Sequence, residues 1–241
     1  MLTTSAHLPV HHDSAQSDTT SGALSAIHEA RHEVLMRLAI AAEYRDEATE
    51  QHMIRLGYMA AKLSALLGES DEFCYLMRLA APMHDVGNIG LPEALLKNPS
   101  TLNAEERALM NTHTEIGFKI LTQADAPLFQ LAASIALTHH ETFDGTGYPK
   151  QLVGHAIPLA GRIVALVDYF DALTMHKPYR ASFSDAQAIE MVQAQSGKLF
   201  DPDMVNVFIA NIESFIQLRH SINASPLKYD QLVNYSHATF L

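Results

Sequence analysis

Cysteine is almost absent: Cys74 is the one thiol among 241 residues. A single thiol cannot build a disulfide framework within the chain, so we expect a protein of a reducing compartment, the cytoplasm. Cys74 stands at an apolar position of a helical pattern and is expected to be a buried core thiol. No apolar run approaches the roughly 20 residues that span a bilayer. The N-terminus shows no basic segment followed by an apolar one, so a signal peptide is not expected either.

Positive charge is also scarce. Lys and Arg together number 16 against 27 Asp and Glu, which gives a formal net charge of -11. Because proteins bind nucleic-acid polymers through cations that neutralise the phosphates, we expect no such partner. A small anion is still a suitable ligand, since bound divalent metals dominate the electric field around them.

The pattern of apolar residues predicts an all-α fold, because strand-like alternation does not recur and no repeat is visible. Residues 1–23 are rich in Ser, Thr and His and are expected to form a disordered tail. A helix is expected over 24–44, and its single apolar stripe suits packing on the core or pairing with a second copy. Residues 45–220 form the main domain, and 221–241 are a C-terminal extension without clear periodicity.

Several signals mark where helices begin. Residues 103–106 and 184–187 have the pattern of capping boxes. The first of these is expected to start one helix that continues to position 120. Further helices are expected over 127–140 and from Pro158 through Asp171.

The stretch over 81–88, Ala-Pro-Met-His-Asp-Val-Gly-Asn, places His84 and Asp85 at the end of an apolar helix expected over 71–83. Pro82 is expected to bend this helix. A buried imidazole beside a buried carboxylate is costly unless a partner satisfies both, and a divalent cation does so. Other parts of the chain supply more donors of the same kind: His52, His113, His139, His140 and Asp168.

Nitrogen and oxygen donors without cysteine favour iron, manganese or another transition metal over a thiolate-bound structural zinc. Neighbours on a helix point about 100° apart, so the two members of a doublet rarely serve one metal in the same way. Two metals, with Asp85 as the bridge, therefore use the donors better than one. Taken singly, each histidine is more often a capped or core residue than a ligand.

His84-Asp85, flanked by His52 and Asp168, resembles the signature of the HD phosphohydrolase superfamily. Residues 139–149, His-His-Glu-Thr-Phe-Asp-Gly-Thr-Gly-Tyr-Pro, resemble the HD-GYP subfamily, which comprises bacterial phosphodiesterases that hydrolyse cyclic di-GMP in second-messenger signalling. The resemblance runs from about Arg45 to about Phe208. It implies an HD-type helical bundle with an N-terminal linker helix.

The resemblance also implies a binuclear metal site in which Asp168 is a ligand and Asp171 is a carboxylate that supports a ligand or caps a helix. One metal would be held by His52, His84, Asp85 and Asp168, and the other by Asp85, His113, His139 and His140.

Two positions depart from the family pattern. Members with three metals have a glutamate four residues before His52, where this chain has Ala48, so two metals are expected unless Glu47 or Asp46 reaches the site. The family usually has a lysine at the position of Asn88, and an amide offers hydrogen bonds without charge.

The resemblance further implies which residues bind and cleave the substrate. Gly145 and Tyr148 would contact it from the loop over 141–157, and the segment Lys-Pro-Tyr-Arg over 177–180 would grip the phosphates. In the family, this loop is linked to interaction with diguanylate cyclase (GGDEF) domains. An ordinary surface connection is the alternative for each segment. The catalytic candidates are Asp85, Asn88, Lys177 and Arg180, and the substrate-binding candidates are Asn88, Gly145, Tyr148, Lys177, Tyr179 and Arg180.

The implied activity is metal-dependent hydrolysis of cyclic di-GMP to linear pGpG, with a second cleavage to GMP as a further step. Two cations would activate a water for in-line attack on phosphorus. Because Ala48 and Asn88 both depart from the pattern, a weakly active or inactive domain that serves as a cyclic di-GMP receptor or scaffold is an alternative. Hydrolysis of another phosphoester, such as a different cyclic dinucleotide, is a third.

Overall fold

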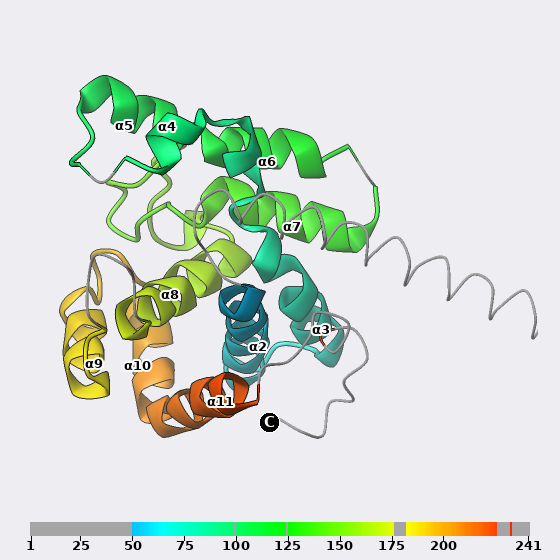
Figure 1. Cartoon of the computed structure of the whole chain (residues 1–241). Helices are drawn as coiled ribbons and strands as arrows, with labels where there is room; N and C mark the ends of the chain where they lie inside the picture. Colours follow the sequence, from blue (N-terminus) through cyan, green and yellow to red (C-terminus); the bar gives the residue numbers. More distant parts are fainter. Residues whose placement is uncertain (1–49, 99, 124, 176–181, 226–231, 233–241) are drawn as a thin grey trace, which may run out of the picture. The chain divides into compact units, whose positions relative to one another are not determined.

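A computed structural model of the chain describes residues 50–98, 100–123, 125–175, 182–225 and 232. The tail expected over 1–23 and the helix expected over 24–44 lie outside these residues. Within these residues all the regular secondary structure is helical, apart from one isolated β-bridge between Ser196 and Phe200 (Figure 1). The predicted all-α class is therefore confirmed.

The described elements include α-helices and three short 3-10 helices. In chain order they are α2 (Glu50–Leu66), α3 (Asp71–Ala80), η1 (Ala81–Met83), η2 (Val86–Gly90), α4 (Glu93–Leu96), α5 (Ala104–Asn111), α6 (His113–Leu121), α7 (Pro127–Thr138), η3 (Gly154–Ala156), α8 (Leu159–Thr174), α9 (Asp185–Ala194), α10 (Pro202–Ala210) and α11 (Ile212–Ala224).

Helix α2 is central to the packing, since it contacts α3, α8 and α11 (Figure 1). Helix α7 packs on α3, α6 and α8, and α9 packs on α8. Aromatic rings join the C-terminal helices to this core: Phe208 lies 5.2 Å from Phe170 and 4.5 Å from Phe215 between ring centroids. All three rings are fully buried, and burial of such a side chain stabilises the fold by roughly 1.5–3 kcal/mol.

Both predicted capping boxes are confirmed. The Asn103 side chain accepts a hydrogen bond from the Glu106 amide, and the Glu106 carboxylate accepts one from the Asn103 amide, both at 2.9 Å. Ser184 and Gln187 make the equivalent pair at 3.3 and 3.0 Å. Such caps satisfy backbone donors that the first helical turn leaves unpaired.

The single helix predicted from position 103 to 120 is wrong, because the chain breaks it at Thr112 into α5 and α6. Three consecutive side chains bond backbone carbonyls three residues earlier: Thr112 to Leu109 (2.7 Å), His113 to Met110 (2.8 Å) and Thr114 to Asn111 (3.0 Å). These bonds accompany a local change in the backbone ladder, since the Thr112 amide donates to the Leu109 carbonyl, three residues earlier and not four, at 3.1 Å. The break places His113 at the first residue of α6.

The helix predicted over 71–83 ends as an α-helix at Ala80 and continues as the tighter η1, which has Pro82 in its first turn. Proline has no amide hydrogen to donate, which accounts for the change. At the other end of the chain, α11 continues past position 220 to Ala224. Among the described residues, no helix combines the length and apolar character needed to cross a membrane.

Candidate metal centre

The His84-Asp85 doublet lies in a tight turn between η1 and η2. The backbone of Gly87 follows it and packs against the start of α6 so closely that a Cβ atom at this position would lie 1.9 Å from the His113 carbonyl oxygen. Glycine is thus required for this approach. The consequence is that Asp85, from this turn, and His113, from the start of α6, face the same space.

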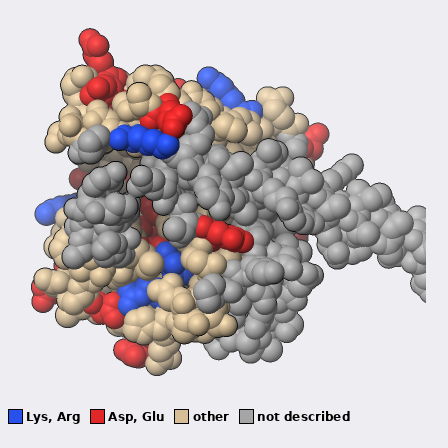
Figure 2. All heavy atoms as spheres, in the orientation of Figure 1, with Lys and Arg blue, Asp and Glu red and all other residues tan. Residues whose placement is uncertain are grey.

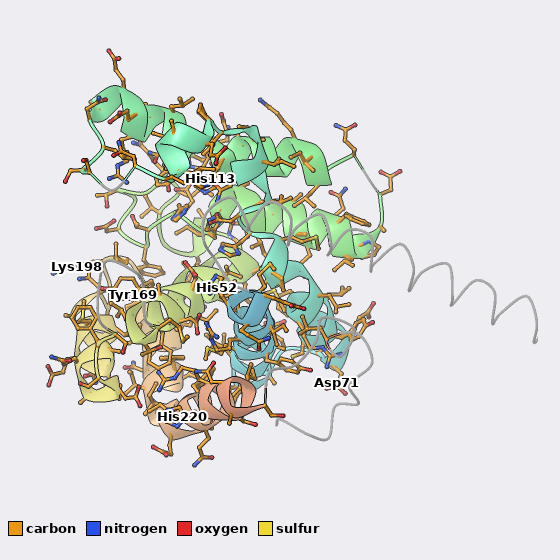
Figure 3. All side chains as sticks on the ribbon, viewed as in Figure 1. His52, Asp71, His113, Tyr169, Lys198 and His220 are labelled. Atoms are coloured by element: carbon orange, nitrogen blue, oxygen red, sulfur yellow. The ribbon has the colours of Figure 1, made fainter. Side chains whose placement is uncertain are left out.

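The described residues contain two groups of side chains that could hold a metal ion. The first cluster is Asp85, His113, His139 and His140, and the second cluster is His52, His84 and Asp168; within each, the candidate ligand atoms lie within 4.8 Å of one another. His52 comes from α2 and His113 from α6 (Figure 3). All seven donors named from the sequence are therefore brought together.

Asp85 faces both clusters. Its Oδ1 atom lies 3.3 Å from His113 Nε2 and 3.2 Å from His139 Nε2, whereas its Oδ2 atom lies 3.7 Å from His84 Nε2. A carboxylate that directs one oxygen to each group of imidazoles has the geometry of a bridge between two cations.

Hydrogen bonds fix the orientation of three of the imidazoles. The Nδ1 atom of His84 donates to the Ala81 carbonyl (3.2 Å), that of His113 to Met110 (2.8 Å) and that of His139 to Ile135 (3.1 Å). Because Nδ1 carries the proton in each ring, Nε2 is left as an electron-pair donor directed into the clusters. This is the arrangement that metal-binding histidines require.

Two buried atoms of the first cluster, Asp85 Oδ1 and His139 Nε2, make no hydrogen bond. Buried polar atoms without partners are rare and costly in folded proteins. A divalent cation would satisfy both at once, so the donor set fits a metal with nitrogen and oxygen ligands.

The protonation states suit a cation as well. Burial lowers the pKa of His84 and lowers that of His140 well below its usual value, so both rings stay neutral. Burial alone would raise the pKa of Asp85, but interactions with the His84, His113 and His139 imidazoles hold it well below its usual range. Neutral imidazoles around an ionised carboxylate are the protonation states that metal ligands adopt.

The second cluster has a supporting carboxylate. His52 lies 3.6 Å from Asp168, and its Nδ1 atom donates to Asp171 at 2.8 Å. Asp171 in turn accepts hydrogen bonds from Arg55, which the sequence reasoning missed. The shared spacing of three residues, His52 to Arg55 and Asp168 to Asp171, was the available signal, because residues three apart share one face of a helix.

The loop after α7 brings Tyr148 to the first cluster. Its ring stacks on His140 with centroids 4.8 Å apart and planes at 24°. Glu141, which is buried, holds the loop closed by accepting hydrogen bonds from the amides of Lys150 (2.6 Å) and Leu152 (2.9 Å). Burial raises the pKa of Tyr148, so its hydroxyl keeps its proton and can donate it in a hydrogen bond.

The other predicted substrate residues differ in their placement. Asn88 is buried and donates from Nδ2 to Asp85 Oδ2 at 3.3 Å, beside the metal ligands. Gly145 lies in a turn of the loop with a φ of 82°, where an added Cβ atom would meet Val153 and not a cluster residue. Lys177, Tyr179 and Arg180 lie outside the described residues.

The chain was compared with known proteins. The model of the HD domain family matches residues 34–204. A cyclic di-GMP phosphodiesterase of Thermotoga maritima is 42% identical over 177 residues, which cover 73% of this chain and 48% of that protein. A cyclic di-GMP phosphodiesterase response regulator of Xanthomonas campestris is 40% identical over 77% of this chain and 49% of its own length. A 3'3'-cGAMP-specific phosphodiesterase of Vibrio cholerae is 37% identical over 81% of this chain and 38% of its own.

Solved structures show the same fold at lower identity. A cyclic GMP-AMP-specific phosphodiesterase of Vibrio cholerae superposes with a TM-score of 0.61 at 20% identity, over 84% of this chain and 52% of that one. A HDG"Y"P protein from Bdellovibrio bacteriovorus gives a TM-score of 0.52, also at 20% identity, over 69% of this chain and 54% of that one. The chain spans about half the length of the curated relatives it matches most strongly.

Proposed function

The chain belongs to the HD domain family and, by its His-Asp doublet and Gly-Tyr-Pro segment, to its HD-GYP branch, and from this premise we propose that it is a metal-dependent phosphodiesterase. Its proposed substrate is cyclic di-GMP and its first product linear pGpG, with GMP as the product of a second cleavage. The relatives of 40% and 42% identity are both cyclic di-GMP phosphodiesterases by name.

One observation carries the proposal: Asp85 directs its two oxygens to two groups of imidazoles, with Nε2 atoms of His84, His113 and His139 3.2–3.7 Å away. A single structural ion would need one group of ligands only. Two groups joined by a carboxylate are typical of sites that cleave phosphoesters, where both the attacking and the departing oxygen need stabilisation.

Two cations in these clusters would activate a water molecule and neutralise charge on the phosphate oxygens. The residues of the chain would do the rest. Asp85 would hold the two clusters in register, and Asn88 would orient Asp85 by its hydrogen bond at 3.3 Å. Tyr148, which stacks on His140 of the first cluster, would donate a hydrogen bond from its hydroxyl to a phosphate oxygen. This contact would align the phosphodiester for in-line attack.

The proposed cofactors are two divalent ions, iron first and manganese or another transition metal as alternatives, because imidazole and carboxylate suit all of them. The ligand set proposed from the sequence keeps its grouping: the second cluster with Asp85 for one ion, and the first cluster for the other. The lysine, tyrosine and arginine of the segment 177–180 are proposed to grip the substrate phosphates.

We propose a small ligand and not a nucleic-acid polymer. On the face in Figure 2, Lys and Arg side chains of the described residues are interspersed with Asp and Glu and do not form a continuous basic track. A nucleic-acid polymer is bound along such tracks. A cyclic dinucleotide needs only the enclosed clusters.

We also propose two protein partners and a location for the chain. The loop around Tyr148 is proposed as the contact for diguanylate cyclase domains, and the helix expected over 24–44 as the contact for a second copy of the chain. We propose a cytoplasmic protein, which agrees with the free, buried thiol of Cys74.

The test is turnover of cyclic di-GMP by protein loaded anaerobically with ferrous iron or manganese, with pGpG and GMP resolved and 3'3'-cGAMP as a second substrate. Asp85→Ala is the loss-of-ligand variant. Asp185→Asn is the matched control, since Asp185 pairs with Arg219 at 2.6 Å on other helices and contacts neither cluster.

Metal-dependent product from the wild type and from Asp185→Asn, but not from Asp85→Ala, is expected. Full activity in Asp85→Ala would contradict the assigned bridge. No product from protein that holds two ions and binds cyclic di-GMP would favour the receptor function instead. Faster cleavage of 3'3'-cGAMP would move the substrate to that dinucleotide.

A further inference from the structure

A line of hydrogen-bonded polar side chains, buried at Asp171 and Arg55, leads from the second cluster to the C-terminal helix. His52 on α2 donates to Asp171 on α8 at 2.8 Å. Arg55, one turn further along α2, donates to both oxygens of Asp171, at 2.6 and 2.8 Å. The third nitrogen of Arg55, Nη1, donates to the Asn223 side chain on α11 at 3.1 Å.

Burying the charged side chains of this line costs desolvation free energy. Asp171 is 0% exposed and Arg55 2% exposed. The desolvation of a buried ion pair commonly offsets its attraction, so well-packed apolar side chains would stabilise the core as well or better. Stability alone therefore does not account for a buried arginine and aspartate at this place, and the contact with His52 suggests another role.

Asp171 holds His52 differently from the way the other ligands are held. His84, His113 and His139 donate to backbone carbonyls, whereas His52 donates to a carboxylate. Asp171 also forms an ion pair with the Arg55 guanidinium, with Oδ1 2.6 Å from Nε, as an ionised carboxylate does. A charged partner makes the imidazole a stronger electron donor and fixes its orientation.

The geometry also joins helices that are far apart in sequence. Helix α11 packs on α2, and its Asn223 reaches the same guanidinium that clamps Asp171 (Figure 1). Because the guanidinium is planar, a hydrogen bond at Nη1 restricts the plane in which the other two nitrogens meet the carboxylate. The position of α11 is thus connected to the orientation of His52.

We propose that Asp171, Arg55 and Asn223 are positioning residues that set how tightly the second cluster retains its metal ion. This inference rests on the proposed metal centre. It assigns to α11 a role in the site although none of its residues is a ligand. Supporting contacts of this kind typically change metal affinity by about 10–100-fold.

The test measures metal content and the rate of metal loss to a chelator, without reference to turnover. In Asp171→Asn, a change of one atom per side chain, one of two bound ions should leave about 10–100-fold faster than in the wild type while the other leaves at the wild-type rate. Asn223→Ala, which leaves Asp171 and Arg55 in place, should change the same ion in the same direction by less.

Ser184→Ala serves as the control for a purely structural effect. It removes the hydroxyl that caps α9 by accepting a hydrogen bond from the Gln187 amide at 3.3 Å, and α9 carries no residue of either cluster. Its unfolding temperature should fall while both ions leave at wild-type rates.

The outcomes separate this inference from the proposed function. Unchanged release of every bound ion from Asp171→Asn would overturn the positioning role and leave the metal centre intact. Equal loss of both ions would also overturn it, because the effect would then be general unfolding. A wild-type protein that binds no metal at all would overturn the metal centre itself.

Discussion

Asn88 is the residue at which chemistry beside the clusters differs most from the HD-GYP pattern, which usually has lysine there. The buried Asn88 amide donates to Asp85 but carries no charge. We expect Asn88→Lys to raise kcat about tenfold, because an ammonium group can stabilise charge that develops on the phosphate oxygens; a tenfold change corresponds to about 1.4 kcal/mol.

The measurement for Asn88→Lys is steady-state hydrolysis of cyclic di-GMP with metal content determined in parallel, since an ammonium group also competes with cations for Asp85. Asn88→Met is the matched control, because methionine is similar in length to lysine but has neither its charge nor its hydrogen-bond donors. This variant should not gain activity. Unchanged kcat in the lysine variant with wild-type metal content would count against a charge deficit at this position.

The lowered pKa values of His84 and His140 lead to a prediction of how the stability of the metal-free protein depends on pH. Burial lowers the pKa of both rings below the ordinary value of 6.5. Below that pH the unfolded chain binds protons that the folded chain does not, so the free energy of unfolding should fall as pH decreases. Each ring contributes a slope of about 1.4 kcal/mol per pH unit in the window between its folded and unfolded pKa.

Chemical denaturation of metal-free protein between about pH 5.5 and 7.5 measures this slope. His84→Gln should lose roughly half of the contribution from the two rings. His155→Gln is the control, because His155 is 69% exposed at its side chain and belongs to neither cluster. An unfolding free energy that rises as pH falls would contradict the assignment of buried neutral imidazoles.

At the scale of elements, apolar periodicity predicted most helices but not the break at Thr112. Apolar residues continue in phase from α5 into α6, so the pattern contains no gap. What ends α5 is local competition by side chains that bond the carbonyls of residues 109–111. The segment Thr-His-Thr over 112–114 supplies the side chains that make these bonds. Apolar periodicity does not detect them, because they are polar.

The contact between η2 and α6 gives a prediction for Gly87. A Cβ atom there would meet the His113 carbonyl oxygen at 1.9 Å and the Gly117 amide nitrogen at 2.7 Å, both backbone atoms that cannot rotate away. Gly87→Ala should lower the free energy of unfolding by about 1–3 kcal/mol, as overpacking does. Because His113 begins α6, the variant should also release metal from the first cluster faster.

Gly90→Ala is the matched control for Gly87→Ala, because it lies in the same 3-10 helix and its Cβ would meet only Ile116 side-chain atoms, the nearest at 3.0 Å. Those atoms can shift, so a smaller loss of stability and normal metal release are expected. Thermal unfolding and chelator-induced release, measured on both variants, are the checks. Equal effects in the two variants would show that the close backbone approach is not what matters.

At the scale of the whole molecule, the site's donors were predictable and its supports were not. Adjacent His and Asp residues and the Gly-Tyr-Pro segment identify donors because unpaired polar groups are rare in apolar helices. Arg55 and Asn223 lack such a signal, since an arginine or asparagine on a helix is ordinarily solvated. Their roles come from the packing of α2, α8 and α11, which brings together residues separated by more than a hundred positions.

Metal removal tests how the clusters hold the molecule together. The donors come from α2, the turn after η1, α6, the end of α7 and α8, so ions bound there connect segments that span most of the described chain. An ion at 100 times its dissociation constant stabilises the folded state by about 2.7 kcal/mol, and the unfolding temperature should fall by about 5–10 °C when a chelator removes it. Asp85→Ala, which lacks the bridge, should unfold at nearly the same temperature with and without chelator. A wild-type unfolding temperature that does not respond to chelator would mean that the imidazoles converge without an ion to hold them.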